Sequence, residues 1–298
     1  MSIDKRSIIT LDVFTDRRFG GNPLAILPDA TGLDDVTMQR IAAELNLSET
    51  VFVHRQASDD VPCLRIFTPR SELPFAGHPT VGTAIYLAEE NGLGSGATLS
   101  MHTRAGLVAA RIHRPAGQLT QAEITAPRAP ECRAAPPADV CAAAISLCTS
   151  NIPFAPAVCD AGNPFTIIPV ATREALSRAR LDHAAWSVGP GSTEAPKLYI
   201  VYMEDWRKGH TIHARMFAPS IGIAEDPATG SAAVALAGLL AAVQAPIDGE
   251  HRWEVHQGDD LGRPSIMALR AVTENGKVAS AHVGGTAVRV IAGSIRVD

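Results

Sequence analysis

Two short stretches of similar build carry polar residues whose types could do chemistry. Residues 76–84 read AGHPTVGTA and residues 223–232 read IAEDPATGSA. Each places a titratable side chain, His78 or Asp226, before a Pro, and each continues through Gly, a hydroxyl residue and Ala into an apolar run. His and Asp side chains can hold or move protons, and glycine lets a ligand approach the backbone. We interpret the two stretches as loops that face one site.

The start of each apolar run is expected to hold an anion. The first N–H groups of a helix lack intrahelical acceptors and lie at the positive end of its dipole. We expect donors from Gly77 and His78 in the first loop and from Thr229, Gly230 and Ser231 in the second, with a carboxylate as the ligand. The alternative is that Thr-Gly-Ser is only a helix N-cap, but repetition of the loop favours the ligand site.

Glu49 is a third candidate. It lies in LNLSETVFV, between the end of a predicted helix and the start of a predicted strand. A lone Glu at a strand start is usually a solvated carboxylate. Its counterpart in the second half of the chain falls in the unrelated segment APK, at 195–197.

The chain contains an internal repeat, which indicates how these residues could be brought together. Similar segments recur in the same order at offsets between 141 and 150 residues: GNPLAILP (21–28) with GNPFTIIP (162–169), TVFV (50–53) with LYIV (198–201), and RIFTP (65–69) with RMFAP (215–219). Such a repeat predicts two similar halves about a pseudo-twofold axis, with a shared cleft between them.

Each half is predicted to be rich in strands, with few helices. Short β-type runs are broken by Gly, Pro and Asn, and amphipathic spacing predicts a surface helix over about 34–45. Central helices are expected from Pro79 to about residue 90 and over 230–243. Because the segment 230–243 is apolar on every side, strands must surround it.

The boundary between the halves is expected in APRAPECRAAPPAD, residues 126–139, which is rich in proline. We therefore assign residues 1–126, together with a C-terminal strand at about 285–298, to the N-terminal half. Residues 127–284 form the C-terminal half.

Composition excludes several classes of function. Of the 298 residues 46% are hydrophobic and 19% are charged, which is typical of a compact protein, and the net charge is −5. We find no Lys/Arg run that could follow nucleic acid. The longest uniformly apolar run, at 232–243, has 12 residues, fewer than the ~20 that span a bilayer. No signal-peptide pattern is seen, so we expect a cytoplasmic protein without membrane or nucleic-acid partners.

The five cysteines show no C-x-x-C spacing, which favours free thiols in a reducing cytoplasm. A metal site is not expected. His210 and His213 form H-x-x-H, but in a strand this spacing points the two side chains to opposite faces.

Segments along nearly the whole chain, from residue 14 to 295, resemble the PhzF-like phenazine-biosynthesis family of the diaminopimelate-epimerase-like superfamily. They are FTDRRFGGNPLAIL, LNLSETVFV, FTPRSELPFAGHPTVGTA, FAPSIGIAEDPATGSAAVAL, QGDDLGRPS and VGGTAVRVIAGSI. The resemblance implies an α+β fold of two pseudo-symmetric domains, each a barrel-like β-sheet around a central helix, and a homodimer.

The resemblance also implies chemistry. Racemases of the superfamily use one cysteine from each half, but His78 and Asp226 stand at the two loops here, so a two-thiol mechanism is disfavoured. The family pattern assigns the moving proton to Glu49, a positioning role to His78 and Asp226, and the substrate carboxylate to Gly77, Gly230 and Ser231. It implies an isomerase similar to trans-2,3-dihydro-3-hydroxyanthranilate isomerase, without cofactor or metal.

Two alternatives stay open at the level of sequence. One is an epimerase or isomerase of another amino or hydroxy acid. The other is a carboxylate-binding protein without turnover, which would not need Glu49, His78 and Asp226 together.

Overall fold

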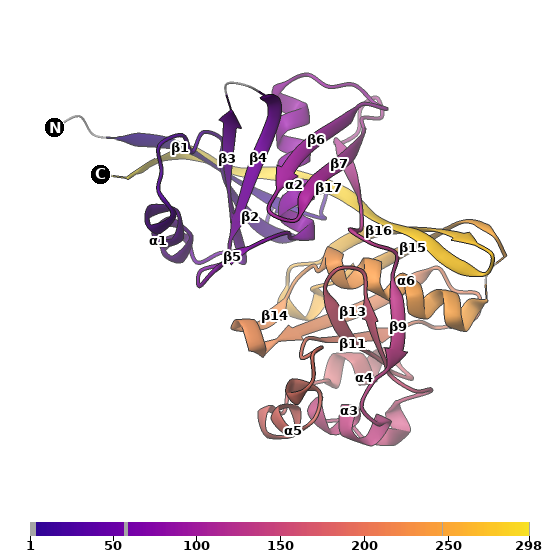
Figure 1. Ribbon diagram of the computed structural model, residues 1–298. Helices are drawn as coiled ribbons and strands as arrows, with labels where there is room; N and C mark the ends of the chain where they lie inside the picture. Colours follow the sequence, from indigo (N-terminus) through magenta and orange to yellow (C-terminus); the bar gives the residue numbers. More distant parts are fainter. Residues whose placement is uncertain (1–3, 57–58, 246, 298) are drawn as a thin grey trace. The chain divides into compact units, whose positions relative to one another are not determined.

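The computed structural model describes residues 4–56, 59–245 and 247–297. The chain divides into two compact units, Met1–Thr125 with Gly284–Asp298 and Ala126–Val283 (Figure 1). Each unit is a barrel-like β-sheet around one central helix, so the predicted α+β fold is confirmed.

The first unit has two helices, α1 (Asp35–Leu45) and α2 (Gly77–Glu90). Its strands are β1 (Lys5–Val13), β2 (Asn22–Leu27), β3 (Glu49–Gln56), β4 (Asp59–Phe67), β5 (Glu72–Leu73), β6 (Thr98–Thr103), β7 (Gly106–His113) and β8 (Gln121–Thr125). The long C-terminal strand β17 (Lys277–Arg296) pairs antiparallel with β1, so the two ends of the described chain run side by side (Figure 1).

The second unit contains α3 (Ala138–Ala144), α4 (Arg173–Arg178), α5 (His183–Val188) and α6 (Gly230–Gln244). Its strands are β9 (Glu131–Ala134), β10 (Ala157–Asp160), β11 (Pro164–Pro169), β12 (Leu198–Tyr202), β13 (Thr211–Ala218), β14 (Ile223–Asp226), β15 (Gly249–Gln257) and β16 (Ser265–Glu274). Short 3-10 turns are η1 (Thr149–Asn151), η2 (Pro190–Ser192), η3 (Pro219–Ile221) and η4 (Asp259–Leu261).

Strand pairing repeats between the units. Strand β2 is parallel to β3, which is antiparallel to β4; in the same way β11 is parallel to β12, which is antiparallel to β13. The register also matches, because Ala25 lies opposite Thr50 and Thr166 lies opposite Leu198. The internal repeat in the sequence therefore corresponds to a repeated arrangement of strands.

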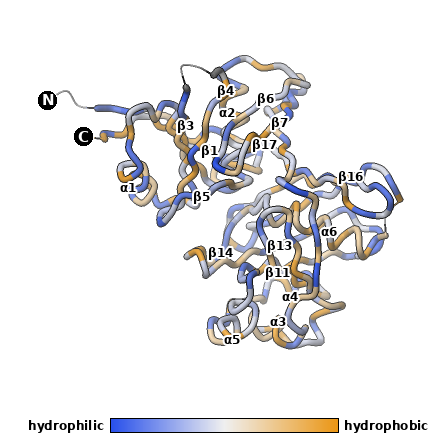
Figure 2. Tube along the Cα trace, in the orientation of Figure 1, coloured by the Kyte–Doolittle hydropathy of each residue, from blue (hydrophilic) through white to orange (hydrophobic). Residues whose placement is uncertain are grey.

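The central helices are buried as their composition requires. Helix α6 contacts β9, β10, β11 and β16, and its small and aliphatic residues are largely shielded from water. Figure 2 shows white to orange colours along most of α6. Helix α2 contacts β1, β2, β3, β7 and β8. Within the described ranges, no helix is long and apolar enough to cross a membrane.

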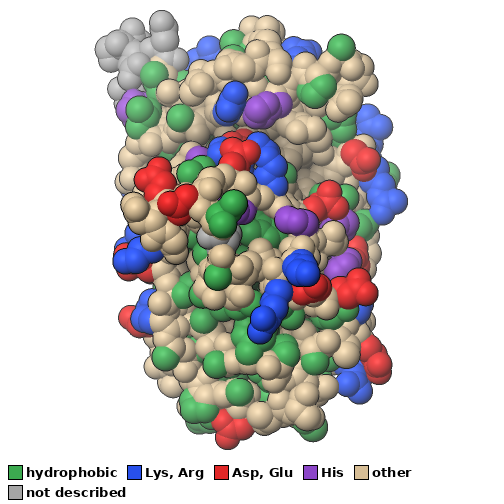
Figure 3. All heavy atoms as spheres, turned by 90° about the vertical axis from the view of Figure 1, so that its right-hand side faces the viewer, with side chains coloured by type: hydrophobic (Ala, Val, Ile, Leu, Met, Phe, Trp, Pro, Cys, Tyr) green, Lys and Arg blue, Asp and Glu red, His purple; other side chains and the backbone are tan. Residues whose placement is uncertain are grey.

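An arginine ion pair is repeated beside the core of each unit. Arg65 forms a bidentate salt bridge with Glu72, and Arg215 forms a bidentate salt bridge with Glu225. These arginines open the repeated RIFTP and RMFAP segments. On the face shown in Figure 3, acidic and basic side chains are interspersed rather than gathered into patches of one sign.

The element boundaries confirm one prediction and correct another. Helix α1 begins after Asp34, whose side chain accepts a hydrogen bond from the Thr37 amide at 2.7 Å, as expected for an N-cap. Helix α2 begins at Gly77 rather than at Pro79, so His78 lies in its first turn and not in a loop. The segment 126–139, expected to connect the halves, belongs to the second unit and contains β9 and the start of α3.

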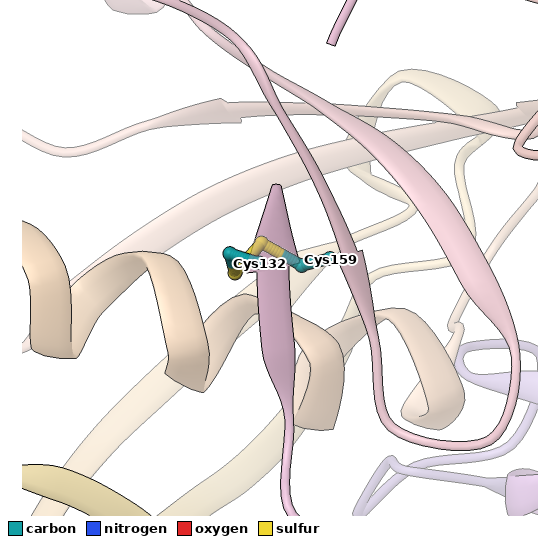
Figure 4. Close-up of a disulfide and its surroundings, with 2 residues drawn as sticks. All are labelled: Cys132 and Cys159. Atoms are coloured by element: carbon teal, nitrogen blue, oxygen red, sulfur yellow. A yellow bond between two sulfur atoms is a disulfide. The ribbon is translucent and has the colours of Figure 1, made fainter. Parts of the chain in front are cut away.

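The expectation of free cysteines is wrong for two of the five. Cys132 of β9 and Cys159 of β10 lie directly opposite each other in an antiparallel pair and form a disulfide (Figure 4). The bond lies against α6, where a Cβ added to Gly238 would come within 2.8 Å of the Cys132 sulfur. Cys63, Cys141 and Cys148 are free thiols.

We expect reduction of the Cys132–Cys159 bond to lower the free energy of unfolding by about 3 kcal/mol, because the bond closes a loop with a sequence separation of 27. Urea unfolding with and without dithiothreitol measures this difference. Cys148→Ser, at an exposed free thiol, is the control and should leave it unchanged. Equal stability of the oxidised and reduced protein would contradict the expectation.

Candidate active site

The first group of site residues lies where β3 begins next to the start of α2. Glu49 is the first residue of β3 and pairs with Leu24 of the parallel strand β2. Its carboxyl oxygen Oε2 lies 3.3 Å from Nε2 of His78. Both residues are buried, at 8% and 5% exposure. The structure therefore brings together two of the three predicted catalytic residues.

The environment of His78 sets its protonation. Burial lowers the pKa of His78 to about 3, and a hydrogen bond to the backbone carbonyl of Pro23 opposes this shift. Because Nε2 faces Glu49, we assign the Pro23 hydrogen bond to Nδ1, which fixes the neutral ring with its lone pair on Nε2. A lone pair and a carboxyl oxygen at this distance attract only when a proton lies between them. The contact therefore becomes attractive when the Glu49 carboxyl is protonated.

The second group surrounds Asp226, the last residue of β14, which is 6% exposed. The Thr229 hydroxyl donates to Asp226 Oδ2 at 2.5 Å. Gln257 of β15 is 1% exposed, and its Nε2 donates to the Asp226 carbonyl at 2.8 Å and to the Thr229 hydroxyl at 3.0 Å. The Asp226 loop is thus held by a buried amide that the sequence analysis did not single out.

Gly258, which follows Gln257, allows the backbone of this segment to approach the Asp226 loop closely. Its φ is +82°, and a Cβ there would lie 2.3 Å from the Arg263 carbonyl oxygen and 2.7 Å from that of Pro227. The Arg263 amide donates back to the Gly258 carbonyl at 3.0 Å, which closes a tight turn. The sequence signal for Gln257 and this turn is the motif QGDDLGRPS.

The start of α6 supplies fewer donors than expected. The Thr229 amide donates to Oε1 of Gln257 at 3.3 Å, so it is used within the protein and is not an open donor. In the part of the chain that the structure describes, the amides of Gly230 and Ser231 have no recorded acceptor, and α6 has no side-chain cap. Gly230 and Ser231 are the residues whose amides were predicted to bind a carboxylate, and this role stays a prediction.

Tyr199 of β12 is a further polar residue near Asp226 that the sequence analysis missed. Its side chain is fully buried, and among the described residues its hydroxyl has no hydrogen-bond partner. Burial raises the pKa of Tyr199, and the charge of Asp226 adds to this effect. Tyr199 therefore keeps its proton and can act as a donor.

The predicted site residues thus form two groups. Glu49, His78 and Gly77 belong to the first unit, and Asp226, Thr229, Gly230 and Ser231 belong to the second. The shared cleft expected from the repeat stays a prediction.

Histidines outside these groups form a second polar cluster. The rings of His213 and His256 are 5.2 Å apart, and His256 contacts Glu254 at 2.6 Å. Among the residues that can be described, no three His, Cys, Asp or Glu side chains are grouped so that they could hold a metal ion.

Comparison with known proteins identifies the family. A family model for phenazine biosynthesis-like proteins matches residues 11–293. An uncharacterized isomerase of Mesorhizobium japonicum is 42% identical, over 97% of this chain and 98% of its own length. The trans-2,3-dihydro-3-hydroxyanthranilate isomerase of Pseudomonas aeruginosa is 35% identical, over 93% of this chain and 94% of its own length.

Solved structures agree with this relationship. The crystal structure of a phenazine biosynthesis protein of the PhzF family from Bacillus anthracis superposes with a TM-score of 0.87, at 26% identity, over 98% of this chain and 99% of that one. The fold and the relatives define the chain as an isomerase. It belongs to the PhzC-PhzF family of phenazine biosynthesis-like proteins.

Proposed function

We propose that this isomerase moves a proton between two carbons of a small carboxylic acid, and that trans-2,3-dihydro-3-hydroxyanthranilate is a substrate. The observation that carries the proposal is the buried contact of 3.3 Å between Glu49 and a neutral His78. The relative named for this substrate, at 35% identity over nearly the whole chain, supports the choice of acid.

The reaction balances without any external electron donor. Glu49 takes a proton from one substrate carbon, and the electrons of the broken C–H bond enter the neighbouring double-bond system. The same carboxyl returns the proton to another carbon, so nothing is oxidised or reduced overall. Once Glu49 holds this proton, the lone pair on Nε2 of the neutral His78 can accept a hydrogen bond from the carboxyl group, which stabilises the protonated form until the proton is returned.

The second group is assigned to binding. The Gly230 and Ser231 amides at the positive end of α6 suit a carboxylate. Asp226 is held in one orientation by Thr229 and Gln257, so it can accept a hydrogen bond from a polar substituent of the substrate. All of these groups belong to the chain itself, so the proposed reaction needs no cofactor or metal.

Turnover in D₂O tests this proposal. We expect the protein to convert trans-2,3-dihydro-3-hydroxyanthranilate and to place deuterium on the carbon that receives the proton, because a carboxyl proton exchanges with solvent. Proton NMR of the product measures both results. If the protein does not convert this compound but racemises an amino or hydroxy acid, the proposed substrate is wrong and the other acid is the substrate. Binding of the acid without any turnover would support a carboxylate-binding protein.

A further inference from the structure

The strand register places a lysine at the position in the second unit that Glu49 occupies in the first. Glu49 precedes Thr50 and lies opposite Leu24, and the repeated pairing puts Lys197 before Leu198, next to Phe165. The backbone agrees, since the Lys197 carbonyl accepts the Thr166 amide at 2.8 Å. The two units therefore carry side chains of opposite charge at equivalent positions.

The residues around these positions are also repeated. Asp12 lies opposite Pro23 in β1 and β2, and Asp160 lies opposite Pro164 in β10 and β11. Both aspartates hold the turn that follows them: Asp12 accepts the Phe19 amide at 2.7 Å, and Asp160 accepts the Gly162 amide at 2.7 Å. The same aspartate-held turn therefore lies beside Glu49 in the first unit and beside Lys197 in the second. This repeated surrounding indicates that Lys197 occupies a defined structural position.

Lys197 is a partly buried cation whose hydrogen bond goes to an uncharged amide side chain. Its Nζ donates to the side-chain oxygen of Asn163 and lies 4.6 Å from the centroid of the Phe165 ring. The nearby carboxylate of Asp160 is taken by Arg128. Within the described residues no acidic side chain forms a salt bridge with Lys197. Buried charges are normally paired, so an anion is the group that this arrangement lacks.

The Phe165 ring links Lys197 to Tyr199, because its centroid lies 4.6 Å from Lys197 Nζ and 6.5 Å from the Tyr199 ring centroid. Residues two apart in a strand point to the same side, whereas Leu198 and Ile200 pack into the core with α3 and α4 on the other side. The charge of Asp226 in turn raises the pKa of Tyr199, so the two side chains are close enough to interact. Lys197 therefore lies on the side of β12 that carries the second group of site residues.

We propose that Lys197 contacts the substrate and pairs its ammonium group with the substrate's carboxylate, so that the second unit selects acids over neutral analogues. This proposal rests on the proposed function for the identity of the acid, but not for the charge of the ligand. The α6 amides supply dipoles for a carboxylate, and Lys197 supplies the full countercharge.

Binding of a matched acid and amide tests the charge pairing. The probes are 3-hydroxyanthranilate and 3-hydroxyanthranilamide, with affinities measured by calorimetry. We expect Lys197→Met to weaken binding of the acid by about tenfold or more while changing binding of the amide little. Lys208→Met, at an exposed lysine of the same unit, is the control and should change neither. Equal loss for both probes, or no loss for the acid, would overturn the proposal.

The pH dependence of binding adds a readout that a structural lysine would not move. Burial lowers the pKa of Lys197 to about 8, against the attraction of Asp160. The ammonium form, and with it the gain in acid affinity, is therefore present below pH 8 and lost above it. Asp160 and Tyr199 do not change charge in this range, because the pKa of Asp160 is lowered and that of Tyr199 is raised. Lys197→Arg, which stays charged, should keep acid binding at pH 9, and a steep loss there would contradict the pairing.

Amine labelling separates failure of this proposal from failure of the proposed substrate. The chain has four lysines, and Lys5, Lys208 and Lys277 are exposed internal controls. Reductive methylation followed by mass spectrometry should show protection of Lys197 by 3-hydroxyanthranilate. If the substrate is a different acid, benzoate and other small carboxylates should still protect it. Protection by no carboxylate would reject the role of Lys197 itself.

Discussion

Replacing Glu49 with Gln should reduce turnover about 100-fold or more while leaving substrate binding within a few-fold of the native protein. The amide keeps the size of the side chain and can still contact His78, but it cannot accept and return a proton. Steady-state kinetics gives the loss in kcat, and calorimetry with 3-hydroxyanthranilate gives the affinity. The deuterium content of any residual product shows whether another group has replaced the carboxyl.

The matched control is Glu44→Gln, which makes the same chemical change at an exposed position of α1. Cys148→Ala, at an exposed free thiol, tests whether a cysteine takes part in the reaction. Both variants should retain native turnover. Full activity in Glu49→Gln, or loss of activity in Cys148→Ala, would show that the proton is carried by a different residue.

Features that depend on local patterns were predictable from the sequence. The repeat of GNPLAILP as GNPFTIIP predicted two similar units. The structure has the same strand register in both units, since Ala25 pairs with Thr50 and Thr166 pairs with Leu198. Helix α6 was predictable because its apolar residues leave no polar face. The meeting of Glu49 with His78 was expected only from the family pattern, since a strand start and a helix start carry no mutual signal.

The features that the sequence did not predict depend on long-range pairing or on missing caps. Cys132 and Cys159 meet through an antiparallel pair, whose spacing is set by the intervening chain and not by a motif. Gln257 reaches the Asp226 loop from β15, which is parallel to β13 and distant in sequence. Helix α2 starts earlier than expected because its N-terminus has no side-chain cap to mark it.

The same reasoning explains why Lys197 was passed over. Alignment by residue type found APK unrelated to the segment around Glu49, because the charge is reversed between the units. The repeat of TVFV as LYIV already places the counterpart of Glu49 in APK, and the strand register shows that Lys197 is the equivalent residue.

Replacing Gly258 with Ala should lower the free energy of unfolding by about 4 kcal/mol or more and should reduce turnover in the folded fraction. Two effects add. The positive φ of +82° strains any residue with a Cβ, and this Cβ would collide with the carbonyl oxygens of Arg263 and Pro227. Neither oxygen belongs to a flexible side chain, so relief requires movement of the backbone beside Asp226. Urea unfolding measures the stability, and kinetics normalised to folded protein measures the turnover.

Gly262→Ala separates the two effects within the same turn. Gly262 also has a positive φ, +68°, but an added Cβ there meets nothing within 4 Å. It should therefore show only the conformational strain, about 1 kcal/mol, with native turnover. The difference between the two variants then reports the close packing of Gly258 against the Asp226 loop. If both variants lost the same stability and kept the same turnover, the close approach at Gly258 would not be what holds Asp226 in place.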